Sequence, residues 1–228
     1  MNVKRRNSSL ENAYKRIKSG DNIVTVEASD QMQTIFVNEE KTSWIKIVKV
    51  PIEYGLTMAE FEQMWALKPE EKHKIKIMGR VISCPRFTKS YLKPYNFSGL
   101  INEADMNFPD RFKQLLKYSH EMNPELNQSL VNWYEYDGSI GKHSDDIRQL
   151  KPDSDIFSYS FGPAIRNFIL EPKKKDSTDP IFHIKLGHNT LVIMGGKCQT
   201  THLHHVPKMQ SGDSSSGRRL NITFRCFK

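Results

Sequence analysis

Residues 181–206 read IFHIKLGHNTLVIMGGKCQTTHLHHV, and this stretch decides the fold class. It contains three short runs of apolar, β-branched and aromatic residues that we expect to be strands: 181–185, 190–194 and 202–206. Turn-forming residues separate these runs: Gly187-His188-Asn189 and Gly195-Gly196. Short runs with such breaks predict β-strands joined by turns, because glycine and asparagine adopt backbone conformations that a strand does not use.

The same pattern extends outward from this stretch. Further strands are expected over four segments: Leu130 to Tyr136, Ile156 to Phe161, Arg166 to Leu170 and Leu220 to Phe227. Before them, Thr57 and Glu60 match a capping box that begins a helix, and a second helix is expected with Pro109 in its first turn. Helices that precede strands, instead of alternating with them, argue against a doubly wound fold. The sequence predicts an α+β fold that is mainly β, with a sandwich, jelly-roll or barrel core and helices packed on a sheet.

Positive charge is concentrated at the N-terminus. The chain has 228 residues and a net charge of +8, and within residues 1–20 Glu11 is the single acid among several Lys and Arg residues. A positive excess favours a polyanionic partner such as nucleic acid, although a solvated tail or a localisation signal has the same composition. We expect residues 1–55 to form a basic, partly flexible N-terminal extension and residues 56–228 to form one domain.

Cysteine usage and the lack of targeting segments bear on the compartment. Cys84, Cys198 and Cys226 are widely spaced, without a Cys-x-x-Cys pair, which indicates a reducing compartment and no disulfides. No apolar run follows the basic N-terminus, and no segment reaches the length of a membrane span. We expect a soluble intracellular protein, nuclear or cytoplasmic, that acts as a monomer without membrane contact.

Histidines and one aspartate form a candidate metal site. His143 and Asp145 lie two residues apart, so in an extended segment both side chains leave the same face. His202 and His204 share a face of a later strand, and either can supply a third ligand, while His205 points the other way. Two histidines and one carboxylate leave open positions that suit a non-haem Fe(II) oxygenase. Structural zinc is the competing interpretation, but such sites normally use clustered cysteines.

Two arginines form a candidate anion site. Arg219 and Arg225 lie six positions apart on one expected strand. This even spacing places both on one face of the strand, together with Asn221 and Thr223. Buried guanidinium groups are costly unless an anion meets them, and a dicarboxylate would satisfy both. The alternative is that each arginine pairs with one of the protein's own acids.

Taken together, these residues resemble the AlkB family of Fe(II)- and 2-oxoglutarate-dependent dioxygenases. The resemblance covers about two thirds of the chain and rests on the following segments: Ile77-Met78-Gly79-Arg80, Pro85-Arg86, Tyr95 to Gly99, Asn132-Trp133-Tyr134, Ile140 to Asp146, Ser158 to Gly162, Leu191 to Met194, His204, Val206-Pro207-Lys208 and Asn221 to Arg225. It implies a double-stranded β-helix, that is, a jelly-roll core with flanking helices, and assigns residues 56–228 to an AlkB-like dioxygenase domain.

The resemblance also implies roles for individual residues. It selects His204 as the distal ligand, so that His143, Asp145 and His204 hold Fe(II). It implies that 2-oxoglutarate is held by five residues: Asn132, Tyr134, Arg219, Thr223 and Arg225. With O2, such an enzyme converts 2-oxoglutarate to succinate and carbon dioxide and hydroxylates an N-alkyl carbon of a nucleic-acid base, which then releases an aldehyde.

The implied substrate is DNA or RNA with alkylated bases such as 1-methyladenine and 3-methylcytosine. The base must be flipped out or unpaired to reach the metal. Tyr95 and Phe97 match positions that line the base pocket, with Phe97 stacking on one side of the base and His143 on the other. Met78-Gly79-Arg80 resembles a hairpin that wedges into a duplex. Asp146 matches an acid on the substrate side, but the next position, usually acidic in repair members, is Ile147.

Two other functions fit part of this pattern. A dioxygenase that hydroxylates a protein or a small molecule would keep the iron and arginine residues without needing the Tyr95 to Gly99 segment. A nucleic-acid-binding module that has lost catalysis would not need the metal ligands, all of which are present.

Overall fold

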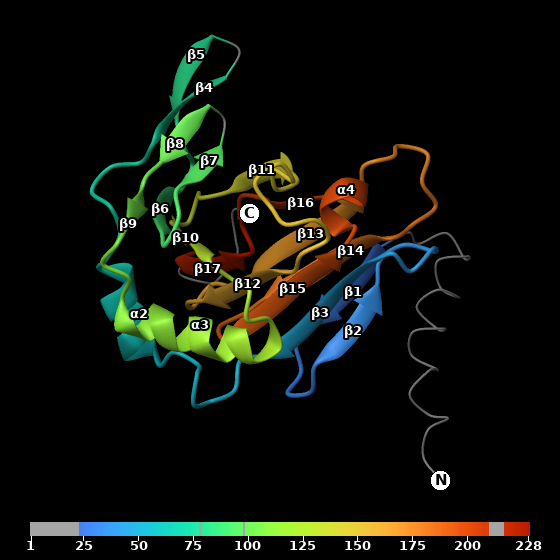
Figure 1. The fold of residues 1–228 in the computed structure, drawn as a ribbon, viewed down its shortest axis with the longest axis horizontal. Helices are drawn as coiled ribbons and strands as arrows, with labels where there is room; N and C mark the ends of the chain where they lie inside the picture. Colours follow the sequence, from blue (N-terminus) through green and yellow to red (C-terminus); the bar gives the residue numbers. More distant parts are fainter. Residues whose placement is uncertain (1–22, 78, 98, 210–216) are drawn as a thin grey trace.

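Two β-sheets form the centre of the fold (Figure 1). The structure, a computed structural model, describes residues 23–77, 79–97, 99–209 and 217–228. The larger sheet has eight strands in the order β2 (Gln33–Phe36), β3 (Ser43–Lys49), β15 (Thr190–Gly196), β12 (Ile156–Phe161), β17 (Arg219–Arg225), β10 (Gln128–Tyr134), β6 (Phe87–Tyr91) and β9 (Ala104–Asp105). The smaller sheet has five strands in the order β1 (Ile23–Glu27), β14 (Ile181–Leu186), β13 (Arg166–Pro172), β16 (His202–Val206) and β11 (Ile140–His143).

From β10 to β17 the chain winds back and forth between the two sheets. Strands β10, β12, β15 and β17 belong to the larger sheet, and β11, β13, β14 and β16 belong to the smaller one. This winding confirms the predicted jelly-roll, or double-stranded β-helix, core, and every expected strand is present with its ends shifted by at most two residues.

Strand β17 shows how the sequence pattern positions the site. Leu220, Ile222 and Phe224 are fully buried in an apolar cluster on one face of the larger sheet. The polar residues between them point to the other face, toward the smaller sheet. Burial of each apolar side chain stabilises the fold by roughly 1.5–3 kcal/mol, so this alternation holds the polar face in place.

Helices α2 (Met58–Trp65) and α3 (Asp110–Met122) cover the outer face of the larger sheet (Figure 1). The capping box is confirmed: the Glu60 amide donates to Thr57 Oγ1, and the Thr57 amide donates to the Glu60 carboxylate. Pro109 is the N-cap residue of α3, one position before the first turn where the sequence placed it. Its missing N–H costs nothing at either position.

The chain before residue 56 contributes to both sheets. Residues 23–49, which the sequence analysis assigned to the N-terminal extension, contain β1, β2 and β3, and β3 pairs with β15 over seven residues. The sheets therefore include residues before position 55, where the sequence predicted the boundary between the extension and the domain. Ile45 and Ile47 are buried between the sheets. Residues 1–22, which hold half of the net positive charge, lie outside the described residues.

Gly195 and Gly196, expected in a turn, instead end strand β15 beside Trp44. A Cβ on Gly195 would meet the Trp44 ring at 2.0 Å, and a Cβ on Gly196 would meet the Thr42 carbonyl oxygen at 2.3 Å. Only glycine allows this close approach, and the φ of Gly196, 60°, also favours it. The short helix α4 (Cys198–Thr201) follows directly and leads into β16.

Two pairs of short strands lie outside the two sheets. They are the hairpin of β4 (Lys74–Ile77) and β5 (Arg80–Ser83), and the hairpin of β7 (Tyr95–Phe97) and β8 (Leu100–Asn102). Both rise from the sheets on the side where β11 lies (Figure 1).

The cysteines are free and buried, as predicted: Cys84, Cys198 and Cys226. Among the residues that the structure describes, no helix has the length and apolar character needed to cross a membrane.

Candidate active site

A pocket of about 770 Å³ lies between the two sheets and extends to the hairpins. Its floor is formed by polar residues of β10, β12 and β17, and its wall by β11 and β16. The predicted iron, cosubstrate and base-pocket residues described by the structure line this one pocket: Asn132, Tyr134, His143, Asp145, His204, Arg219, Thr223, Arg225, Tyr95, Phe97 and Asp146. Gly79 and Arg80 are described but do not line it, and Met78 lies outside the described residues.

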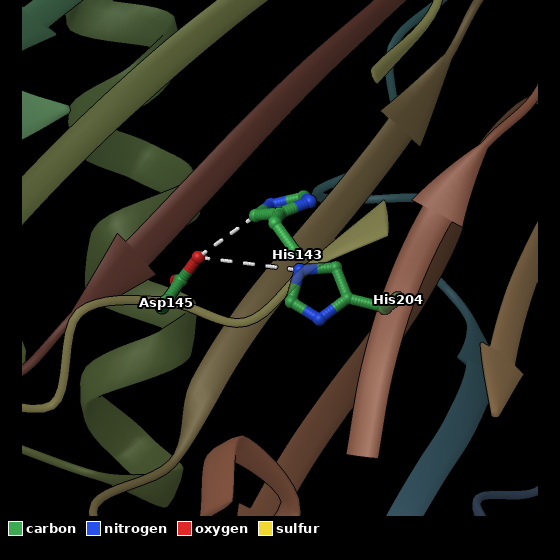
Figure 2. A group of neighbouring side chains, drawn as sticks. All are labelled: His143, Asp145 and His204. Carbon is green, nitrogen blue, oxygen red and sulfur yellow. Dashed lines mark ion pairs between the residues drawn. The ribbon is translucent and has the colours of Figure 1, made fainter. Parts of the chain in front are cut away.

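His143, Asp145 and His204 converge on one point (Figure 2). Asp145 Oδ1 lies 3.8 Å from His143 Nε2 and 4.0 Å from His204 Nε2. The three ligand atoms lie within 4.8 Å of one another. His143 and His204 are direct partners in the register of β11 and β16, so strand pairing brings the two rings together.

These three groups present electron pairs to one another. Burial lowers the pKa of both histidines, that of His204 to about 3, so both rings are neutral near pH 7. His143 Nδ1 lies 2.8 Å from the Gly141 carbonyl oxygen, which fixes the proton on Nδ1 and leaves the Nε2 electron pair free to face Asp145. Asp145 Oδ1 is buried and has no hydrogen-bond partner among the described residues. A cation would satisfy all three atoms, so this donor set fits Fe(II).

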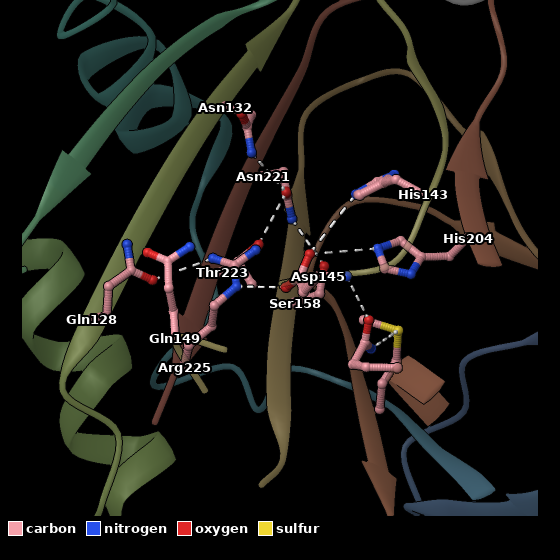
Figure 3. Close-up of polar contacts among 12 residues, drawn as sticks. Gln128, Asn132, His143, Asp145, Gln149, Ser158, His204, Asn221, Thr223 and Arg225 are labelled. Carbon is pink, nitrogen blue, oxygen red and sulfur yellow. Dashed lines mark hydrogen bonds and ion pairs between the residues drawn. The ribbon is translucent and has the colours of Figure 1, made fainter. Parts of the chain in front are cut away.

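Arg225 pairs with Asp145 behind the candidate metal position (Figure 3). Its Nε donates to Asp145 Oδ2 at 2.6 Å, and its Nη1 donates to Gln128 Oε1 at 3.3 Å. Burial alone would raise the pKa of Asp145, but Arg225 and the two histidines hold it well below its usual range. The carboxylate is therefore charged, with Oδ2 held by Arg225 and Oδ1 facing the histidines.

Arg219 differs from Arg225 because no acid among the described residues pairs with it. It is 2% exposed, its Nε donates to Ser160 Oγ at 2.7 Å, and its guanidinium lies 5.0 Å from the centre of the Tyr134 ring. Its Nη1 has no hydrogen-bond partner among the described residues. Burial lowers its pKa to about 10, so it remains charged near pH 7. A buried cation without an acidic partner is costly, and an anion in the pocket would offset that cost.

Amides and hydroxyls of β10, β12 and β17 hydrogen-bond to one another beside Arg225 (Figure 3). Thr223 Oγ1 and the Asn132 amide both donate to Asn221 Oδ1, and the Asn221 amide donates to Ser158 Oγ and to the Tyr159 carbonyl oxygen. These hydrogen bonds fix the orientation of two predicted cosubstrate residues, Asn132 and Thr223, and of Asn221 beside them. The polar face of β17 is therefore preorganised.

The aromatic residues of the predicted base pocket stand at the outer part of the same pocket. Tyr95 is buried and lies beneath Arg225, whose guanidinium is 4.6 Å from its ring centre. Phe97 is half-buried, 6.1 Å from Tyr95 between ring centres, and its other neighbour is the edge of His73 at 6.4 Å. Tyr95 thus packs against Arg225 on the side of the pocket that contains Asp145, while the ring of Phe97 is open toward the outer part of the pocket.

Asp146, the expected acid on the substrate side, is engaged by Arg148. The Arg148 Nε and Nη2 donate to the two carboxylate oxygens at 2.7–3.1 Å. These hydrogen bonds lower the pKa of Asp146 to about 2. The guanidinium therefore engages both carboxylate oxygens of Asp146.

Several residues that hold the site were not predicted from the sequence. Ser158 and Ser160 on β12 and Gln128 on β10 contact the predicted arginines or their neighbours, and Arg86 Nε donates to Asn132 Oδ1 at 3.1 Å. Alternation within β12 could have placed the two serines on the inner face, but no local signal connects them with Arg219.

The comparisons agree with this geometry. The family model of the 2OG-Fe(II) oxygenase superfamily matches residues 53–225. The chain is 32% identical over 162 residues to the DNA oxidative demethylase ALKBH2 of Mus musculus, covering 67% of this chain and 66% of the relative. It is 33% identical over 150 residues to the alpha-ketoglutarate-dependent dioxygenase alkB homolog 3 of Rattus norvegicus, covering 62% of this chain and 50% of the relative. The chain thus spans half to just under two thirds of these relatives.

The fold has a counterpart among solved structures. The structure of OsALKBH1 superimposes with a TM-score of 0.54 at 14% identity and covers 86% of this chain and 99% of that one. At this identity the likeness shows a common fold.

Proposed function

This chain belongs to the 2OG-Fe(II) oxygenase superfamily as an AlkB-like member, and from this we propose that it oxidatively removes alkyl groups from nucleic-acid bases such as 1-methyladenine and 3-methylcytosine. The observation that carries the proposal is that one pocket joins three kinds of residue: His143, Asp145 and His204 at one point, Arg219 as a buried cation, and Phe97 at the outer part. Relatives named as DNA oxidative demethylases support the choice of substrate class.

We assign iron binding to His143, Asp145 and His204. Fe(II), 2-oxoglutarate and O2, when bound, supply an oxidation that yields succinate and carbon dioxide and hydroxylates a substrate carbon. The protein keeps both histidines neutral and Asp145 charged, which are the protonation states that metal ligation needs.

Arg219 is the proposed partner of the far carboxylate of 2-oxoglutarate. Its Nη1 is a buried donor without a hydrogen-bond partner in the described part of the chain, and Tyr134 lies against its guanidinium. Asn132, Thr223 and Arg225 line the wall between it and Asp145 and would complete the cosubstrate site. Arg225 contributes in a second way, because it orients Asp145.

The base would enter between the hairpins and the metal site. Phe97 offers a ring for stacking, His143 lies across the pocket, and the flipped base would sit between them. Gly79 and Arg80 belong to the β4–β5 hairpin at the edge, where an exposed Arg80 is available to a phosphate.

The test is release of succinate and formaldehyde from matched oligonucleotides with and without the methylated base. We expect both products to require Fe(II), 2-oxoglutarate and the methylated base, and His143→Ala to abolish them. Succinate without base-dependent formaldehyde would assign the oxidation to a protein or small-molecule substrate. Absence of both products from folded, metal-bound protein would contradict the proposed enzymatic activity.

A matched pair of variants tests the choice of ligand. His204→Ala is expected to abolish both products and His205→Ala to retain them, because His205 alternates to the opposite face of β16. Activity in His204→Ala would contradict the assigned metal site.

A further inference from the structure

Asp145 lies in an irregular segment between the end of β11 and the start of β12, so no strand pairing holds its main chain. Two contacts hold it instead. Arg225 Nε donates to Oδ2 of the side chain at 2.6 Å, and the Asp145 amide N–H donates to Gln199 Oε1 at 2.8 Å. The second contact is buried and spans 54 residues of sequence.

Gln199 is placed to connect the two ligand-bearing segments. It belongs to α4, the single turn directly before β16, and His204 follows five residues later. Its side chain is 8% exposed, and its main-chain carbonyl oxygen accepts a hydrogen bond from Lys173 Nζ at 2.7 Å. Gln199 therefore has a fixed main chain and a buried amide directed at Asp145.

The orientation of this amide is determined by its neighbours. The Nε2 group donates to the Met194 thioether at 3.6 Å, and Oε1 faces the Asp145 N–H. A flipped amide would place two donors against each other, a buried conflict that costs roughly 1–3 kcal/mol. The oxygen thus stays on the Asp145 side.

We propose that Gln199 is a positioning residue of the metal site, which holds the main chain of Asp145 at a set distance from His204. This inference rests on the proposed assignment of His143, Asp145 and His204 as ligands. Arg225 sets the rotation of the carboxylate, and Gln199 sets the place of the Cα from which it extends. Groups that orient ligands in this way typically change metal affinity about 10- to 100-fold when removed.

A purely structural role is the alternative, since any buried N–H needs an acceptor. Asn127 provides a matched control. Its Oδ1 accepts the Phe227 N–H at 2.8 Å, and Asn127 does not line the pocket. Asn127→Leu should lower stability without changing metal affinity.

The experiment measures Mn(II) binding to the apo-protein by electron paramagnetic resonance, the Co(II) absorption spectrum, and the Tm of the apo-protein. Gln199→Met keeps the length and removes the acceptor. We expect its Kd for Mn(II) to rise about 10- to 100-fold and the Co(II) bands to shift, while Asn127→Leu lowers Tm alone. An unchanged Kd in Gln199→Met, with a lower Tm, overturns the inference.

Two further variants complete the design. If Gln199→Met does not fold, Gln199→Asn decides, because its shorter amide cannot reach Asp145, and wild-type affinity there overturns the inference. His204→Ala distinguishes failure of the ligand assignment from failure of the role of Gln199. If His204→Ala binds Mn(II) like the wild type, the ligand assignment itself is wrong. If His204→Ala loses Mn(II) and Gln199→Met does not, only the role of Gln199 fails.

Discussion

The metal side of the pocket and its hairpin side are built differently. His204, Arg219 and Arg225 come from strands paired on both sides in the two sheets, and all three are buried. The hairpins β4–β5 and β7–β8 pair only within themselves, and they expose Val81, at 67%, and Ile101, at 61%. Two-stranded hairpins are marginally stable alone, so their position depends on a few contacts with the sheets.

This difference indicates which side of the pocket determines the reaction and which side determines the choice of substrate. On the metal side, Asp145 and Arg225 pair with each other, and Arg219 is buried without an acidic partner among the described residues, which suits chemistry common to a whole family. The hairpin side carries exposed apolar groups and an Asp146 already paired with Arg148, which suits substrate choice that varies between members. Changes on the metal side should therefore have large effects, and changes on the hairpin side should have graded ones.

The largest effect is expected for Asp145→Ala. It removes a ligand and leaves Arg225 buried without its acid, so the apo-protein should lose about 3–5 kcal/mol of unfolding free energy in addition to all activity. Urea unfolding of the apo-protein measures the loss. Asp110→Ala, which removes an exposed pair with Lys113, is the control and should unfold like the wild type.

Arg219→Met comes next. The KM for 2-oxoglutarate should rise about 10- to 150-fold, because a hydrogen-bonded charge contributes about 1.5–3 kcal/mol. Steady-state succinate production measures it. Arg218→Met is the matched control, since Arg218 alternates to the outside and pairs with Glu62 on the surface. An unchanged KM in Arg219→Met would assign the far carboxylate to another residue.

Phe97→Leu should act on the hairpin side alone. Loss of stacking is expected to lower kcat/KM for a methylated oligonucleotide about 5- to 150-fold, since stacking on one base contributes about 1–3 kcal/mol. Succinate production without a base should remain at the wild-type rate. A parallel fall in both rates would mean that Phe97 supports the metal side instead.

Gln149→Ala should have a smaller effect through the position of the β7–β8 hairpin. The Gln149 amide donates to the Asn96 carbonyl oxygen at 3.1 Å and accepts the Asn96 N–H at 3.4 Å. Each such contact contributes about 0.5–1.5 kcal/mol, so KM for the oligonucleotide should rise about two- to tenfold. Faster amide hydrogen exchange at Asn96 would show the loosened hairpin directly, and unchanged exchange would exclude this anchor.

The smallest effect is expected for Arg148→Ala. It releases Asp146 from an exposed pair, and the relative kcat/KM for bases with and without an exocyclic amine should shift by less than about fivefold toward the amine. Competition between two oligonucleotides in one reaction measures the ratio. A shift in the opposite direction would mean that Arg148, instead of Asp146, faces the base.

Much of the fold was predictable from local patterns. The capping box at Thr57 and the strands from Leu130 onward depend on neighbouring residues, so they can be read from the sequence. The strands between residues 23 and 49 were missed. Strands β1 and β2 are partly exposed, and β3 pairs with β15, a contact between residues 141 to 153 positions apart that no local pattern shows.

The site was predictable to a similar extent. Alternation placed Arg219, Asn221, Thr223 and Arg225 on one face, but it could not decide what each arginine meets. The structure divides them: Arg225 pairs with the protein's own Asp145, as the alternative predicted, whereas Arg219 has no acidic partner among the described residues. The contact of Gln199 with Asp145 carried no sequence signal, because it joins helix α4 to the segment after β11, 54 residues away in the sequence.

The sequence by itself determined which side chains share a face, because alternation along a strand is a local property of the backbone. It left His202 and His204 equivalent, since both occupy the same face of β16. Only the tertiary structure decided between them. The register of the smaller sheet sets His204 opposite His143 and His202 opposite Pro172. The His204 ring therefore lies 4.2 Å from the His143 ring between centres, so strand register, a contact between distant segments, brings His204 and not His202 to the site.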